Sequence, residues 1–228
     1  MQHRSAKRLL AMATVTAVGA AGLTACSGVF DQRHRTVSYG VHETVHALVV
    51  KGGTGDVHVT GGSGPVQVTE RQNYHDTPPN ATHTTTDGTL TLAYSGRDTA
   101  IDYDVRVPAG TVVTITDDTG DIRVAGISGA VRATTDTGSV TGSGLTSRQV
   151  ELVSDTGDVT ARLDAVPDRV SAGSGTGKVD LKVPGNASYA VTATAGTGKA
   201  RVEVPQATGS RHTISAKAGT GDVTVSAG

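Results

Sequence analysis

Short runs of alternating apolar and polar residues dominate the chain from residue 44 to residue 228. Examples are Val57-His58-Val59 and Leu90-Thr91-Leu92, and turns rich in glycine separate one run from the next. A period of two places successive side chains on opposite faces of a β-strand, whereas an amphipathic helix repeats every three to four residues. No run with helical spacing occurs beyond Cys26. The pattern therefore predicts an all-β domain of short strands.

A four-residue phrase recurs along this domain: Thr-Gly, then any residue, then Val, Ile or Ala. Its regular copies begin at positions 119, 137, 156, 176, 197 and 220, so the interval is near twenty and widens slowly along the chain. An internal repeat of this period is typical of a solenoid, in which each coil stacks on its neighbours because it cannot bury its apolar face alone. The predicted corner residues are Thr54, Gly55, Thr119, Gly120, Thr137, Gly138, Thr156, Gly157, Thr176, Gly177, Thr197, Gly198, Thr220 and Gly221.

We therefore expect a single-domain β-solenoid, similar to a parallel β-helix, over residues 44–228. Its residues 44–110 form an irregular part, and residues 111–228 form regular coils. Glycine permits a sharp corner, and the threonine before it is expected to stack on the threonine of the next coil. Six coils stacked at about 4.8 Å would make a rod roughly 25–30 Å long. The last coil, at residues 220–225, is expected to leave an open edge that favours self-association.

The composition is consistent with a thin core. Aromatic residues make up 3% of the 228 residues, with no Trp and one Phe, while glycine occurs 30 times. Small β-branched side chains fill a narrow space between strands, so few large side chains are needed. The length suits one domain preceded by a leader.

Residues 1–25 have the features of a cleaved signal segment. A basic start with Arg4, Lys7 and Arg8 precedes an apolar run at residues 9–23. This run is shorter than the roughly 20 residues that a membrane-spanning helix needs. We predict removal of residues 1–25.

The end of this segment, Leu23-Thr24-Ala25-Cys26, resembles the lipobox of bacterial lipoproteins. The resemblance implies cleavage before Cys26 and diacylation of its sulfur. Cys26 is the only cysteine, so it has no disulfide partner within the chain. Two acyl chains suffice for stable anchoring, which predicts a protein held on the extracytoplasmic face of the cell membrane. The alternative is an ordinary secreted protein cut at an Ala-x-Ala-like site.

The charge balance argues against nucleic acid as a partner. The chain has 20 Lys and Arg, and removal of the three in the signal segment leaves 17 against 21 Asp and Glu. A polyanion-binding protein would instead carry an excess of basic residues.

Two segments fall outside the repeat pattern. Residues 26–43 are expected to form the lipidated cysteine and a flexible tether. Residues 70–87 contain Pro78-Pro79 and are expected to form the longest loop, where a binding surface could lie. His42 and His46 could share one strand face, but no Cys or carboxylate pair accompanies them, so we interpret them as surface residues rather than metal ligands.

The serial Thr-Gly-Asp-Val coils, the Leu90-Thr91-Leu92 strand and the strand end at Val107-Pro108 together resemble the putative-adhesin β-solenoid family of bacterial envelope proteins. The resemblance covers residues 45–228. It implies the same solenoid fold and no established enzymatic activity.

Three patterns could carry chemistry, and each has a structural explanation. The first is Asp-Thr-Gly, at Asp118, Asp136 and Asp155, which aspartic proteases use in two facing copies that share a proton. Here the copies recur one coil apart, which predicts a stacked row instead of a facing pair. We therefore interpret the phrase as a corner.

The second pattern is the set of aspartates that follow the corner glycines: Asp56, Asp121, Asp158 and Asp222. Carboxylates of successive coils could approach one another and bind calcium, which takes six to eight oxygen ligands. We favour surface-corner aspartates and leave calcium open. The third pattern, Arg123, Arg132, Glu151 and Arg162, could line one face as in carbohydrate-cleaving β-helices, although a solvated face has the same spacing.

We therefore expect a non-enzymatic binding, adhesin-like or scaffold module of the bacterial envelope. Its expected partners are the membrane, through lipidated Cys26, and an envelope protein or glycan, with no cofactor beyond the lipid. The alternatives are an enzyme that acts on polysaccharide or peptide through the solenoid face, and an accessory protein of envelope-stress signalling.

Overall fold

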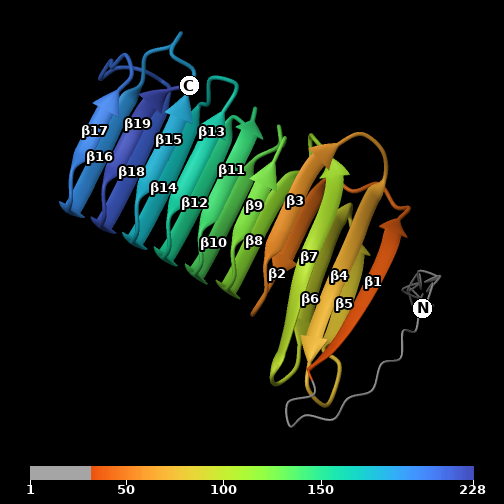
Figure 1. Cartoon of the computed structure of the whole chain (residues 1–228). Coiled ribbons are helices and arrows are strands. Elements are labelled where there is room, and N and C mark those ends of the chain that lie inside the picture. The colour runs from red at the N-terminus through yellow and green to blue at the C-terminus, as the bar shows by residue number, and fades with distance from the viewer. Residues whose placement is uncertain (1–31) are drawn as a thin grey trace, which may run out of the picture.

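Two β-sheets lie face to face and enclose a single apolar core (Figure 1). The structure is a computed structural model that describes residues 32–228, so the predicted signal segment and Cys26 lie outside the described residues. All secondary-structure elements between residues 32 and 228 are β-strands. None of this part of the chain forms a helix with the length and apolarity needed to span a bilayer. The predicted all-β solenoid is confirmed.

Sheet A has ten strands and sheet B has nine. In spatial order, sheet A contains β1 (Arg33–Val41), β4 (Val66–Tyr74), β7 (Thr99–Pro108), β3 (Val57–Gly62), β9 (Ile122–Ala125), β11 (Val140–Leu145), β13 (Val159–Leu163), β15 (Val179–Val183), β19 (Val223–Ala227) and β17 (Ala200–Glu203). Sheet B contains β16 (Ala190–Thr197), β18 (Thr213–Thr220), β14 (Arg169–Thr176), β12 (Gln149–Thr156), β10 (Val131–Thr137), β8 (Val112–Thr119), β2 (Ala47–Lys51), β6 (Thr89–Ser95) and β5 (Asn80–Thr86).

Each regular coil consists of a sheet B strand, a Thr-Gly corner, a sheet A strand and a return loop. Strands of neighbouring coils pair in parallel, as β10 does with both β8 and β12. Alternate side chains point into the space between the sheets. In β12, Val150 and Leu152 are buried, and in β13 Val159 and Ala161 meet them from the other sheet. The core is thin because these inward side chains are small.

The strand order corrects the prediction of an open edge at the last coil. The last coil, β18 and β19, lies inside the rod, between the β14–β15 coil and the β16–β17 coil. The open edge is therefore formed by residues 190–203 instead of residues 220–225. All these coils have the same Thr-Gly corner, so the sequence pattern does not reveal which coil stacks outermost.

The predicted tether at residues 26–43 is wrong from residue 33 onward, because β1 pairs antiparallel with β4. Val37, Tyr39 and Val41 alternate with polar residues and turn toward the core. The segment lacks a repeat phrase, and its partner strand is distant in the chain, so local pattern did not identify it as a strand.

The predicted loop at residues 70–87 is also wrong for most of its length. Residues 70–74 belong to β4 and residues 80–86 to β5, which leaves a turn at residues 75–79. The inward positions of β4 include polar residues, Glu70 and Gln72, which are 2% and 4% exposed. Because β4 has polar side chains on both faces, this part of its sequence lacks the alternation of apolar and polar residues that indicates a strand.

A buried polar cluster fixes β1 onto β4. The Tyr39 hydroxyl donates to Glu70 Oε1 at 2.8 Å, and Gln72 Nε2 donates to Glu70 Oε2 at 2.9 Å. Burial and the Glu70 carboxylate raise the pKa of Tyr39, so the phenol remains a donor at neutral pH. A buried carboxylate is tolerated when donors satisfy it in this way.

Replacing Tyr39 with Phe tests whether β1 belongs to the folded domain. Tyr39→Phe removes one donor to buried Glu70, so the free energy of unfolding in urea should fall by about 1–3 kcal/mol. Ser38→Ala is the matched control, because Ser38 contacts Thr69 on the exposed side of the same strand and its loss should change little. Equal stability of Tyr39→Phe and the wild type would show that β1 does not pack on β4.

Candidate functional site

The seven Thr-Gly corners stack in one continuous row along the lower edge of the rod in Figure 1. The threonines of neighbouring coils lie opposite one another, all are exposed, and their order is Thr54, Thr119, Thr137, Thr156, Thr176, Thr220, Thr197. The amide of each corner glycine except Gly198, in the outermost coil, donates to the carbonyl of the threonine in the next coil at 2.8–2.9 Å: Gly55 to Thr119, Gly120 to Thr137, Gly138 to Thr156, Gly157 to Thr176, Gly177 to Thr220 and Gly221 to Thr197. We refer to this row as the corner ladder.

The corner ladder leaves no room for a side chain at the glycine. Gly138 has a φ of 135°, in the region that only glycine adopts readily. A Cβ added to Gly138 would lie 2.0 Å from the carbonyl oxygen of Gly120, and one added to Gly157 would lie 2.1 Å from that of Gly138. Close approach of neighbouring backbones therefore requires glycine at the second position of each phrase.

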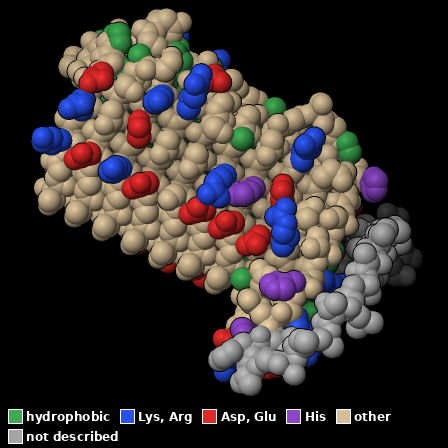
Figure 2. Space-filling model, in the orientation of Figure 1, with side chains coloured by type: hydrophobic (Ala, Val, Ile, Leu, Met, Phe, Trp, Pro, Cys, Tyr) green, Lys and Arg blue, Asp and Glu red, His purple; other side chains and the backbone are tan. Residues whose placement is uncertain are grey.

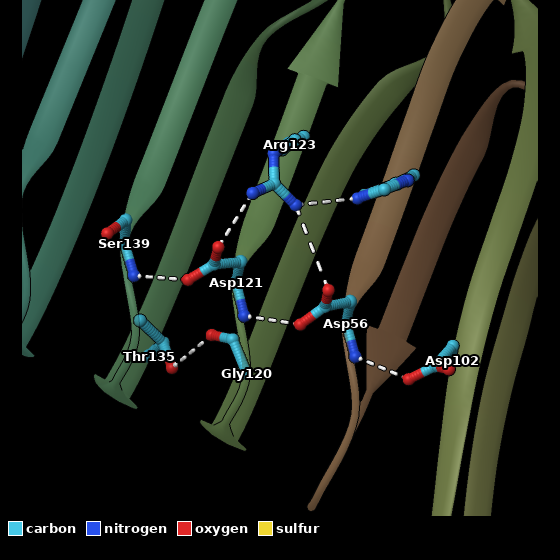
Figure 3. Close-up of polar contacts among 8 residues, drawn as sticks. Asp56, Asp102, Gly120, Asp121, Arg123, Thr135 and Ser139 are labelled. Atoms are coloured by element: carbon cyan, nitrogen blue, oxygen red, sulfur yellow. Dashed lines mark hydrogen bonds and ion pairs between the residues drawn. The ribbon is translucent and has the colours of Figure 1, made fainter.

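The aspartates after the corner glycines accept hydrogen bonds from the next coil (Figure 3). Asp56 Oδ1 accepts from the amide of Asp121 at 2.9 Å, and Asp121 Oδ1 from that of Ser139 at 2.9 Å. Asp102 of β7, which follows no corner glycine, accepts from the amide of Asp56 at 3.0 Å. Asp158 and Asp222 do the same for the amides of Lys178 and Lys199. These carboxylates, considered above as calcium ligands, satisfy corner amides. In residues 32–228 no three potential ligands gather into a group suited to a metal ion.

Arg123 bridges two of these aspartates on the outer face of sheet A. Its Nη2 lies 2.7 Å from Asp121 Oδ2, and its Nη1 lies 3.8 Å from Asp56 Oδ2 and 2.9 Å from His58 Nε2 (Figure 3). Basic and acidic side chains are interspersed across this face (Figure 2). Half-exposed pairs of this kind contribute about 0–1 kcal/mol and leave a largely neutralised surface.

The four residues proposed to line a carbohydrate-cleaving face do not share one. Arg123 and Arg162 belong to β9 and β13 of sheet A, whereas Arg132 and Glu151 pair with each other on β10 and β12 of sheet B. Arg162 pairs instead with Asp164 at 3.0 Å. The sequence spacing could not reveal that the first and last of the four residues lie on sheet A and the middle two on sheet B.

The repeated Asp-Thr-Gly aspartates also do not converge. Asp118, Asp136 and Asp155 are exposed and lie on the successive parallel strands β8, β10 and β12. They form a row along one edge, whereas a protease dyad requires two carboxylates that face each other.

An inner row of hydroxyls supports the corners from the core side. Thr135, Ser154 and Ser174 are buried, and each hydroxyl donates to a corner glycine carbonyl of the preceding coil: to Gly120 at 3.3 Å, Gly138 at 2.7 Å and Gly157 at 2.8 Å. Backbone oxygens that turn inward at the corners are satisfied in this way.

Asp117 occupies the same position in β8, at one end of this row. It is 2% exposed, and neither of its carboxyl oxygens has a hydrogen-bond partner. Burial, and then the charges of Asp118 and Asp56, raise the pKa of Asp117 from its ordinary value of 3.8 to about 7. The carboxyl group is therefore protonated over most of the acidic range.

The sequence reasoning missed a pocket at the opposite end of the coils, where the return loops lie. It has a volume of about 530 Å³ and is lined by Arg148, Val166, Asp168, Ala187, Arg211 and His212. His212 Nδ1 lies 2.7 Å from the carbonyl oxygen of Pro167, which fixes the ring. Arg148 Nη1 is 3.7 Å from Asp168 Oδ2. The lining contains two arginines and one acidic residue, so basic groups are in excess. We refer to it as the return-loop pocket.

One sequence signal did mark this region. The interval between corners grows toward the end of the chain, as the positions 119, 137, 156, 176, 197 and 220 show, and the strands keep similar lengths. Most of the added residues therefore enter the return loops, of which residues 204–212 form the longest in the regular coils. Loops on a rigid scaffold commonly carry binding residues.

The architecture defines a class of protein: a two-sheet β-solenoid with glycine corners on one edge and variable loops on the other. The family model described as Toastrack DUF4097 matches residues 27–228, so the chain belongs to this family. A search of curated proteins finds no match to the chain.

Two solved structures match the chain over most of its length. One, from Clostridium sporogenes, is described as a "putative cell adhesion protein"; it is 13% identical, with a TM-score of 0.53, and the match covers 86% of this chain and 100% of that one. The other, from Bacteroides fragilis, is described as a "putative adhesin"; it is 13% identical, with a TM-score of 0.48, and the match covers 86% of this chain and 97% of that one. At this identity the likeness to the Clostridium sporogenes structure shows the fold alone.

The pKa of Asp117 predicts how stability depends on pH. Because the folded state holds the proton and the unfolded state releases it near pH 4, this group makes the free energy of unfolding fall as pH rises from about 4 to about 7. Asp117→Ser should remove this decrease and raise stability at pH 8 by about 1–3 kcal/mol, since a hydroxyl can donate where a buried carboxylate has no partner.

Urea unfolding at pH 5 and pH 8 measures this effect. Asp155→Ser is the control, because Asp155 is exposed at another corner and should leave the pH dependence as it is in the wild type. An unchanged pH dependence in Asp117→Ser would show that Asp117 is not a buried, protonated group.

Proposed function

We propose that this protein is a lipid-anchored binding module of the bacterial envelope, held on the extracytoplasmic face of the membrane through Cys26. The observation that carries the proposal is that the two ends of the rod differ. Strand β1 begins at Arg33, shortly after Cys26, and lies at one end, whereas the return-loop pocket lies toward the other end. An anchor at Cys26 would hold the β1 end near the membrane and leave the pocket exposed to partners.

The geometry favours binding over catalysis. The aspartates of the repeated phrases are used in the corner ladder or spread along one edge, and the outer charges of sheet A neutralise one another. A catalytic site needs groups that converge within hydrogen-bond reach of a reacting atom. The description of the similar structure from Clostridium sporogenes as a "putative cell adhesion protein" supports the same assignment.

The return-loop pocket is the surface that we assign to a partner. It combines Arg148, Arg211 and His212 with the apolar side chains of Val166 and Ala187. Guanidinium groups bind carboxylates and phosphates well, and apolar lining adds contact area. An envelope glycan or protein that bears anionic groups fits this chemistry.

Replacement of Cys26 tests the anchor. Cys26→Ala removes the sulfur that would be acylated, so the protein should move from the membrane fraction to the soluble extracytoplasmic fraction, as measured by immunoblotting of separated fractions. Ser27→Ala, next to the cysteine, is the control and should remain in the membrane fraction. Full retention of Cys26→Ala on the membrane would refute the lipoprotein assignment.

A further inference from the structure

The two ends of the rod differ in how they are closed. At the β1 end, β1 pairs antiparallel with β4 and β5 with β6, and β1 carries exposed Arg33, His34 and Arg35. Basic residues on an edge strand, as on β1, discourage further pairing. At the other end, β16 and β17 are the outermost strands of sheets B and A among the described strands. We refer to β16 and β17 together as the tip.

The edge of β16 has none of the features that usually protect a free edge. Its sequence, Ala-Val-Thr-Ala-Thr-Ala-Gly-Thr, contains no charge and no proline. The residue before the strand, Tyr189, is covered, because its amide donates to Pro205 O and the amide of Ala207 donates to Tyr189 O, both at 2.9 Å. A long, uncharged edge strand offers unpaired amides and carbonyls to another strand.

At the tip, the apolar core is also partly exposed to solvent. Val191, Ala193 and Ala195 of β16 and Val202 of β17 point toward the core but are only partly buried. Their counterparts in the neighbouring coil, Ile214, Ala216, Ala218 and Val225, are 0–5% exposed. Stacked-repeat proteins normally close such an end with a polar cap, because the last repeat otherwise exposes apolar surface.

The charges on β17 identify which partner fits. Arg201 and Glu203 lie on the outer face of β17, with Arg201 Nε 3.6 Å from Glu203 Oε1, and both are more than half exposed. In an antiparallel pair of two β17 strands centred on Val202, each Arg201 faces the Glu203 of the other copy. Stacking the tip on the β1 end of another copy would instead bring the basic residues of β1 toward Arg201.

We propose that the tip is the contact surface of a homodimer. One two-fold axis perpendicular to the sheets pairs β16 with β16 and β17 with β17, each antiparallel, so that both sheets and the core continue from one copy into the other. The β1 ends then lie at opposite ends of the dimer. If both copies carry the proposed anchor, this is the arrangement in which proteins on two facing membranes would meet.

Sedimentation equilibrium of the full chain in mild detergent tests the dimer. The wild type should show a monomer–dimer equilibrium. Ala193→Lys should raise the dimer dissociation constant at least tenfold, because a lysine at the open end of the core can reach solvent in the monomer but is buried in the dimer. Thr116→Lys, on the exposed outer face of β8 in the middle of the rod, is the matched control and should dimerise as the wild type does.

A charge exchange tests the antiparallel register. Arg201→Glu alone should weaken the dimer, since it places like charges opposite each other, and the double variant Arg201→Glu with Glu203→Arg should restore it. A wild type that stays monomeric at all concentrations, an Ala193→Lys variant that dimerises normally, or a double variant as weak as the single one would each overturn the proposal.

Repeating the measurement with Cys26→Ser separates this proposal from the lipid anchor. The tip lies at the far end of the rod from β1, so the dimer should persist whether or not Cys26 is acylated. Loss of dimerisation in Cys26→Ser would show that the lipid or its micelle, instead of the tip, joins the copies, and would refute the tip as the contact surface.

Discussion

The rod depends on one backbone contact, repeated from coil to coil: the amide of a corner glycine donates to the carbonyl of the threonine in the next coil. This contact brings neighbouring backbones so close that a single methyl group at Gly138 would overlap the Gly120 carbonyl. The corner therefore accepts only glycine. Once it is set, the strands on either side are aligned in parallel register, and aliphatic side chains are directed into the narrow core.

Other polar features of the rod follow from this corner. Inside it, the hydroxyls of Thr135, Ser154 and Ser174 satisfy glycine carbonyls; outside it, aspartates such as Asp56 and Asp121 satisfy the following amides. The carboxylates considered from the sequence as calcium ligands are thus parts of the turn. The return loops bear no such constraint, and the longest of them in the regular coils, residues 204–212, contributes Arg211 and His212 to the pocket.

The repeat phrase was sufficient to predict the coils, because each phrase specifies a corner from local chemistry alone. The β1 end was less predictable. Glu70 and Gln72 occupy inward positions and are stable there only because Tyr39, from a distant segment, reaches Glu70. The order of the final coils was not predictable either, since β16 and β18 carry the same phrase and similar inward residues, and only three-dimensional packing places β18 between β14 and β16. In the sequence, only the growing interval between Thr-Gly corners indicates the region of the return-loop pocket.

The stability of two glycine-to-alanine variants tests the corner most directly. Gly138 lies in the corner ladder, whereas Gly173 lies within β14 and an added Cβ there meets nothing within 4 Å. Gly138→Ala should lower the free energy of unfolding in urea by about 1–3 kcal/mol or more, from overlap and from backbone strain at positive φ. Gly173→Ala should be neutral or slightly stabilising. Equal stability of the two variants would contradict the account.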